Sequence, residues 1–108
     1  MLAILRTANV QRQREWDPTN SVSLEYRGNE LAGEVGEACN VIKKIVRERL
    51  GIRGSRATQA DLADELADVI ICVDLIAAHE GIDLCAAVRN KFNYTSFRYN
   101  LKTRLEEV

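Results

Sequence analysis

Gly33-Glu-Val-Gly-Glu37 places two glutamates three residues apart, and Asp64-Glu-Leu-Ala-Asp68 repeats this arrangement with Glu65 and Asp68. On a helix, side chains at this spacing project from one face. An apolar arc with helical periodicity borders each acidic pair, which predicts two amphipathic helices that bury these arcs against each other. The arcs are Leu31, Val35, Ala38, Ile42, Ile45 and Val46 on the first helix and Leu62, Leu66, Val69, Val73 and Ala77 on the second.

This packing would bring four carboxylates together at the rim of one helical core. Two like charges about 4 Å apart repel by roughly 4 kcal/mol at an effective dielectric of 20. A cluster of this kind needs a cation, so the sequence predicts a metal site. The predicted ligands are Glu34, Glu37, Glu65 and Asp68.

Helix-terminating and capping residues divide the chain into four predicted helices and leave no convincing strand pattern. The first ends before Pro18, which disfavours helix at the preceding residue. A capping box of Thr58 and Asp61 opens the third helix, and Asp83 caps the fourth. The helices are expected at about 2–15, 21–50, 58–80 and from 83 onward. The predicted class is all-α, with residues 1–108 as a single domain.

Composition restricts the class of protein further. The chain has 108 residues, of which 46% are hydrophobic, and a formal net charge of −1, which argues against a protein built mainly to bind nucleic acid. The first residues lack the apolar stretch of a signal peptide, and no run has the length of a membrane span, so we expect a cytoplasmic protein without membrane contact. Cys39, Cys72 and Cys85 lack metal-binding spacing and are expected to be reduced packing residues.

The third predicted helix carries a run, residues 69–78, that is apolar almost all round, with Asp74 as its only charge. Such a helix is expected to be covered on several sides. One chain of four helices has little material for this, so the run predicts a homodimer or homotetramer with a shared bundle of two long antiparallel helices at its core. The alternative is that the first and fourth helices cover the run within one chain.

Four stretches of the chain resemble a known family. They are Arg14-Glu-Trp16, Leu31-Ala-Gly-Glu-Val-Gly-Glu37, then after 27 further residues Glu65-x-x-Asp68 within 64–70, and Lys91-Phe-Asn-Tyr-Thr-Ser96. Together they resemble the signature of the all-α nucleoside triphosphate pyrophosphohydrolases, specifically the MazG-like group, over residues 14–98.

The resemblance implies hydrolysis of a nucleoside triphosphate or its deoxy form between the α- and β-phosphates, giving a monophosphate and pyrophosphate with Mg²⁺. Such activity would clean unwanted nucleotides from the cellular pool. It also implies substrate binding by Lys91 and Asn93. Family members often carry a second Glu where this chain has Gly33, and Glu30, one turn earlier, is the nearest replacement.

Elementary chemistry supports a metal site of this kind. Mg²⁺, with Mn²⁺ as an alternative ion, takes oxygen ligands and shares its shell with phosphates and water. Glu34 or Glu37 is the expected catalytic base that takes a proton from the attacking water. A di-iron centre would require Glu-x-x-His ligands, but His79 is the only histidine and Ile76 stands at that spacing.

Two further residues are candidates for substrate binding, each with a structural alternative. Trp16 is either a platform on which a nucleobase stacks or a hydrophobic anchor for the first helix. Lys44 either contacts a phosphate or pairs with Glu37 or Glu48 on its own helix. For the whole chain, the alternative to an enzyme is a non-enzymatic helical interaction module whose acidic face binds a basic partner.

Overall fold

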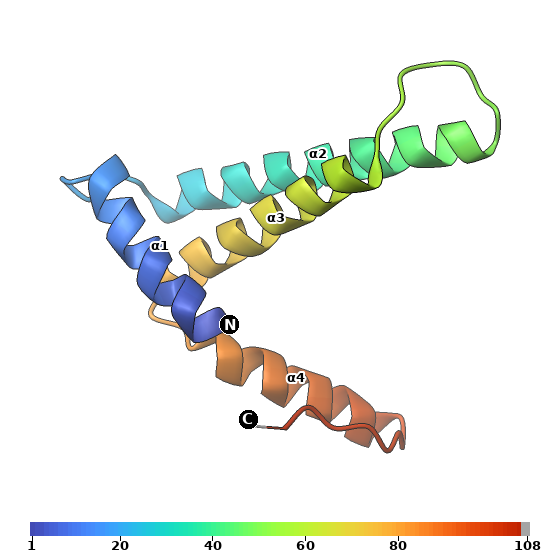
Figure 1. Cartoon of the computed structure of the whole chain (residues 1–108). Coiled ribbons are helices and arrows are strands. Elements are labelled where there is room, and N and C mark those ends of the chain that lie inside the picture. Colours follow the sequence, from blue (N-terminus) through green and yellow to red (C-terminus); the bar gives the residue numbers. More distant parts are fainter. Residues whose placement is uncertain (107–108) are drawn as a thin grey trace.

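The computed structural model describes residues 1–106, and within this range it contains four α-helices and no strands. The all-α prediction is therefore confirmed. The helices are α1 (Leu2–Trp16), α2 (Leu24–Arg49), α3 (Gln59–His79) and α4 (Leu84–Arg98) (Figure 1).

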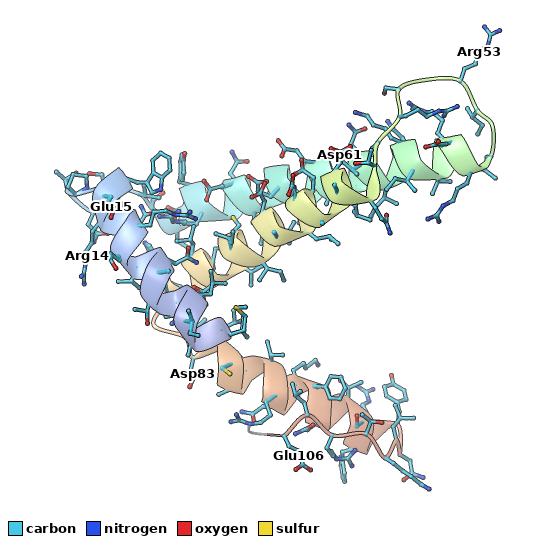
Figure 2. All side chains as sticks on the ribbon, in the orientation of Figure 1. Arg14, Glu15, Arg53, Asp61, Asp83 and Glu106 are labelled. Carbon is cyan, nitrogen blue, oxygen red and sulfur yellow. The ribbon has the colours of Figure 1, made fainter. Side chains whose placement is uncertain are left out.

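Local capping residues fix the helix boundaries close to where the sequence predicts them. Thr58 and Asp61 form the predicted capping box at the beginning of α3. Asp83 accepts a hydrogen bond of 3.0 Å from the backbone N–H of Ala86 at the beginning of α4, and Figure 2 shows both acids at these positions. Gly81, with φ of 67°, ends α3 in the left-handed conformation that favours glycine.

The two longest helices, α2 and α3, run antiparallel and pack along each other as a hairpin (Figure 1). Residues 50–58 connect them in a loop that two arginines brace. Arg47 donates a hydrogen bond of 3.1 Å to the carbonyl of Ser55, and Arg56 donates one of 2.8 Å to the carbonyl of Ile52. Arg53 points outward from the loop (Figure 2).

The packing of this hairpin differs from the predicted one. Val35, Ile42 and Leu66, which the sequence places in the buried arcs, are 42%, 45% and 50% exposed. The helices approach through the face of α2 that carries Glu34 and Ala38, so Ala38 and Ala77 of the predicted arcs are buried as expected while other members of the arcs are not. The reason is helical geometry, because residues 27, 34, 38, 41 and 45 share one narrow face, and the apolar stripe lies beside it.

A buried polar network holds α1 against α3. Asp74 has no exposed surface, and its carboxylate accepts hydrogen bonds of 3.1 Å from Arg6 Nε and 3.0 Å from Asn9 Nδ2. Asn9 also donates to the carbonyl of Ile71, at 3.3 Å. Arg6 Nη2 donates to the carbonyl of Ile82 beyond the end of α3, at 2.8 Å. These contacts fix α1 across the hairpin.

The fourth helix points away from the hairpin and does not cover α3 (Figure 1). The radius of gyration is 17.2 Å, whereas a compact domain of this length has about 13 Å. The accessible surface is 8236 Å², against about 6,000 Å² for a compact monomer of this mass. The alternative was that the first and fourth helices cover the apolar run of α3 within one chain. It is wrong in its second part, because α4 does not lie on α3. No helix in residues 1–106 is long and apolar enough to span a membrane.

Replacing Asp74 tests whether the buried network stabilises the fold. Asp74→Ala removes the carboxylate that Arg6 and Asn9 share and leaves each with one backbone carbonyl, so we expect the free energy of unfolding to fall by about 3 kcal/mol, the lower end for broken buried pairs. The lower end applies because the Arg6 side chain keeps 27% exposure. Urea denaturation followed by circular dichroism, at one fixed protein concentration, measures this change. The control Asp64→Ala, at an exposed acid of the same helix, should change stability by less than about 0.5 kcal/mol. Equal stability of the two variants would contradict the assignment.

Candidate functional site

Three carboxylates from the two hairpin helices meet at one place. Glu34 and Glu37 of α2 and Glu65 of α3 each bring one oxygen to within 4.8 Å of the others. We call these three residues the acidic triad. Three of the four residues predicted as metal ligands thus lie together, and the fourth, Asp68, lies on the exposed surface beside them.

The triad contains two buried oxygens without partners. Glu34 Oε2 and Glu65 Oε2 are out of contact with water and form no hydrogen bond with any described residue. Buried polar atoms in native proteins nearly always have a hydrogen-bond partner, so each exception needs an explanation. A cation held between the carboxylates would supply one.

Burial and repulsion both raise the pKa of these groups. The pKa of Glu34 is raised above its ordinary 4.5, first by loss of hydration and then by the charges of Glu37, Asp68 and Glu30. The pKa of Glu65 is raised first by loss of hydration and then by Glu37, with smaller contributions from Asp68 and Glu34. Asp68 therefore acts on both groups electrostatically although its oxygens are not part of the triad.

A pocket of about 470 Å³ opens beside the triad between α1, α2 and α3. Glu34 and Asp68 line it together with the aromatic side chains of Trp16 and Tyr26. Trp16 is 78% exposed, so it does not anchor α1 in the core of this chain. Its position in the pocket wall leaves it available to stack on a ligand.

Two buried side chains, Arg27 and Cys72, also line this pocket. Both approach the same oxygen, because Arg27 Nη1 lies 3.4 Å and Cys72 Sγ 3.6 Å from Glu30 Oε1. Burial, followed by the charge of Glu30, raises the pKa of the Cys72 thiol to about 11. Cys72 is thus a protonated packing residue, as predicted, whereas Cys39 and Cys85 are exposed free thiols.

The structure does not bring the other predicted substrate-binding residues to the triad. Lys44 lies near the beginning of α3, where Thr58 lowers the pKa of Asp61 through hydrogen bonds and Lys44 lowers it further. Lys91 lies on α4 with its Nζ 5.5 Å from the centre of the Tyr94 ring. Asn93, also on α4, donates to the carbonyl of Leu105 at 2.9 Å and accepts from its N–H at 2.7 Å.

Tyr26 and Arg27 line the pocket and were not predicted from the sequence. A signal for Arg27 was present in the sequence. It lies seven residues, or about two helical turns, before Glu34, and therefore on the same face of α2. A cation and an acid on one face of a helix that also carries apolar residues indicate a polar site rather than a solvated surface.

Comparisons of the chain with models of protein families, with curated proteins and with solved structures found no match. The resemblance to the MazG-like group therefore stays a prediction that rests on the motif residues.

The raised pKa values predict a characteristic dependence of stability on pH in the absence of divalent ions. A carboxyl whose pKa is raised by folding stabilises the protein below its ordinary value of 4.5, and this contribution is lost as the pH rises through the raised value. The double variant Glu34→Gln and Glu65→Gln lacks these charges. Its gain in stability over the wild type should therefore grow as the pH rises above about 4.5.

Thermal unfolding of both proteins in EDTA, from about pH 4 to pH 7, measures this difference. Comparing the two proteins at each pH cancels the contribution of carboxyls with lowered pKa, such as Asp17. Glu48→Gln, at an exposed acid of α2, is the matched control and should follow the wild type. A constant difference across the pH range would show that the two carboxyls are not strained by burial.

Proposed function

We propose that this protein is a Mg²⁺-dependent nucleoside triphosphate pyrophosphohydrolase that cleaves nucleotides or deoxynucleotides between the α- and β-phosphates. Its products would be the nucleoside monophosphate and pyrophosphate, and its role the removal of unwanted nucleotides from the cytoplasmic pool. One observation carries the proposal. Glu34 and Glu65 of the acidic triad each have a buried, unpartnered oxygen, and Glu34 also lines a pocket that contains aromatic side chains.

The triad suits a magnesium ion. Mg²⁺ holds oxygen ligands at about 2.0–2.1 Å in octahedral geometry, so ligands on opposite sides are about 4.2 Å apart. The triad oxygens, all within 4.8 Å of one another, are close to this spacing. Glu34, Glu37 and Glu65 would hold the ion, with Asp68 adding negative charge beside them. The bound ion would neutralise phosphate charge and make a water molecule more acidic.

The remaining pocket residues suit the rest of a nucleotide. Trp16 and Tyr26 offer aromatic surface on which a base stacks, while Glu34 and Asp68 lie where the triphosphate would approach the ion. A catalytic base works best when its pKa lies near the operating pH. Glu34 and Glu37 remain the two candidates, and the proton acceptor would be the one that lies at the edge of the ion's ligand shell.

We also propose that a second copy of the chain covers the apolar side of the hairpin. Helical periodicity places the exposed stripe of α2 on the side away from Glu30 and Glu37, and that of α3 on the side away from Asp68. These exposed residues are Val35, Ile42 and Val46 of α2 and Leu66 and Ile70 of α3.

The area of uncovered surface fits this assembly. Each chain exposes about 2,000 Å² more than a compact monomer of its mass, so two chains have about 4,000 Å² to bury between them, within the range of about 2,000–5,000 Å² for obligate homodimers. The expected assembly is a homodimer or homotetramer. Because α4 points away from its own triad, substrate binding by Lys91 and Asn93 would require the α4 of a partner subunit to reach the pocket.

The enzymatic proposal predicts the behaviour of two conservative variants. Glu37→Gln and Glu65→Gln keep the side-chain shape but remove a ligand charge, so each should reduce turnover by at least about 100-fold. Pyrophosphate release from a panel of ribo- and deoxynucleoside triphosphates, with Mg²⁺ and with EDTA, measures this. Glu48→Gln is the control and should retain full activity. If the wild type releases no pyrophosphate from any nucleotide, the interaction module with an acidic face becomes the better explanation.

The assembly proposal predicts the effect of a charge on the apolar side. Ile70 is 51% exposed in the single chain, so Ile70→Glu leaves the charge in water there but buries it in the assembly. Sedimentation at micromolar concentration should find an oligomer for the wild type and a smaller species for Ile70→Glu. Asn40→Glu, at an exposed polar position of α2, introduces the same charge and should leave the oligomer intact. A monomeric wild type would contradict the proposal.

A further inference from the structure

Arg27 is a buried cation with few partners. Its exposed fraction is 5%, and its side chain forms one hydrogen bond to a described residue, the 3.4 Å contact with Glu30. The backbone N–H groups of Ser21 and Val22 lower the pKa of Asp17, and the charge of Arg27 lowers it further. A guanidinium carries five N–H donors, and no Arg27 nitrogen is both buried and unpartnered. Arg27 lines the site pocket and also the neighbouring pocket of about 510 Å³. Its unused donors are therefore available to a ligand.

The pocket wall around Arg27 carries carboxylates, namely Glu30, which contacts Arg27, and Glu34 and Asp68 beside the acidic triad, and it also carries a second cation. Arg12, in the same pocket wall, has only donors. Asp17 is an acceptor, but both of its oxygens are engaged by backbone N–H groups, those of Ser21 and Val22, each at 2.9 Å. The aromatic part of the pocket thus offers N–H groups to a ligand that brings acceptors.

Nucleobases differ in what they present to such a surface. Guanine, uracil and thymine carry a carbonyl oxygen where adenine and cytosine carry an amino group, and adenine accepts hydrogen bonds only through ring nitrogens such as N7. A donor facing another donor leaves two polar groups unpaired, and sites built around hydrogen bonds discriminate strongly against such ligands.

We infer that Arg27 binds the nucleobase by donating hydrogen bonds to carbonyl oxygens, and that the protein prefers guanine, uracil or thymine nucleotides to adenine nucleotides. This inference rests on the proposed function, since it assumes that the pocket holds a nucleotide. The competing explanation gives Arg27 a purely internal role, in which it only neutralises Glu30.

Binding of monophosphates in EDTA tests the inference without hydrolysis. Trp16 is the only tryptophan and lines the pocket, so its fluorescence reports occupancy. The wild type should bind dGMP and dTMP at least about 10-fold more tightly than dAMP. Arg27→Met should weaken dGMP and dTMP binding by about 10- to 100-fold, the value of one charge-assisted hydrogen bond, and change dAMP binding by less than about 3-fold.

Two further variants separate base recognition from neutralisation of Glu30. Arg27→Lys keeps the positive charge but loses the planar guanidinium group. The preference for dGMP and dTMP over dAMP should therefore be smaller in this variant than in the wild type. Under the competing explanation, Arg27→Lys would bind like the wild type, and adding Glu30→Gln to Arg27→Met would restore dGMP and dTMP binding. Circular dichroism tests whether each variant is folded. If Arg27→Met does not fold, the base preference of Arg27→Lys compared with that of the wild type tests the inference.

The outcomes also separate this inference from the proposed function. Equal weakening for all bases, or no preference against dAMP in the wild type, would overturn the role of Arg27. Pyrophosphate release without base preference would leave the hydrolase standing and remove only this inference. Base-selective binding without pyrophosphate release from any triphosphate would support Arg27 and overturn the hydrolase.

Discussion

The position of α1 depends on the hydrogen bonds that the buried carboxylate of Asp74 accepts. Because α1 forms part of the pocket wall, the pocket depends on them too. The hydrogen bonds between α1 and α3 all come from Arg6 and Asn9, and two of the three end on this carboxylate. Trp16 lies seven residues beyond Asn9 on the same helix, which is about 10 Å along its axis. A polar contact at the first half of α1 thus determines where its aromatic end meets the rim of the pocket.

The α2–α3 hairpin contains a destabilising arrangement that packing alone does not explain. Its helices come together along a face that removes oxygens of Glu34 and Glu65 from water and leaves them without partners. Apolar residues such as Val35 and Leu66 meanwhile stay exposed beside that face. Unfavourable arrangements of this kind and perturbed pKa values concentrate at functional sites, where stability is given up for chemistry. This reasoning supports the triad as the centre of the function.

The sequence was sufficient for the helices and for much of the triad, because both depend on local patterns. Caps such as Thr58 and Asp83 act within one turn, and the three-residue spacing fixes which acids share a face. The direction of α4 was not predictable, since it follows from tertiary contacts that leave no periodic signal. The exposed stripes were missed for a related reason, because hydrophobic periodicity identifies an apolar face without stating which molecule covers it. Arg27 was overlooked because a single cation on a helix is usually solvated.

The separation between Arg6 and Asp74 also bears on the order of folding. These partners are 68 residues apart, whereas α2 and α3 are joined by a short loop. Contacts between nearby segments form faster than distant ones, because less chain entropy is lost when they close. During synthesis α1 emerges from the ribosome first, yet it has nothing to dock on until α3 has followed. We therefore expect the hairpin and its triad to form first, and the pocket to be completed when α1, the first helix made, packs last and brings Trp16 to the pocket.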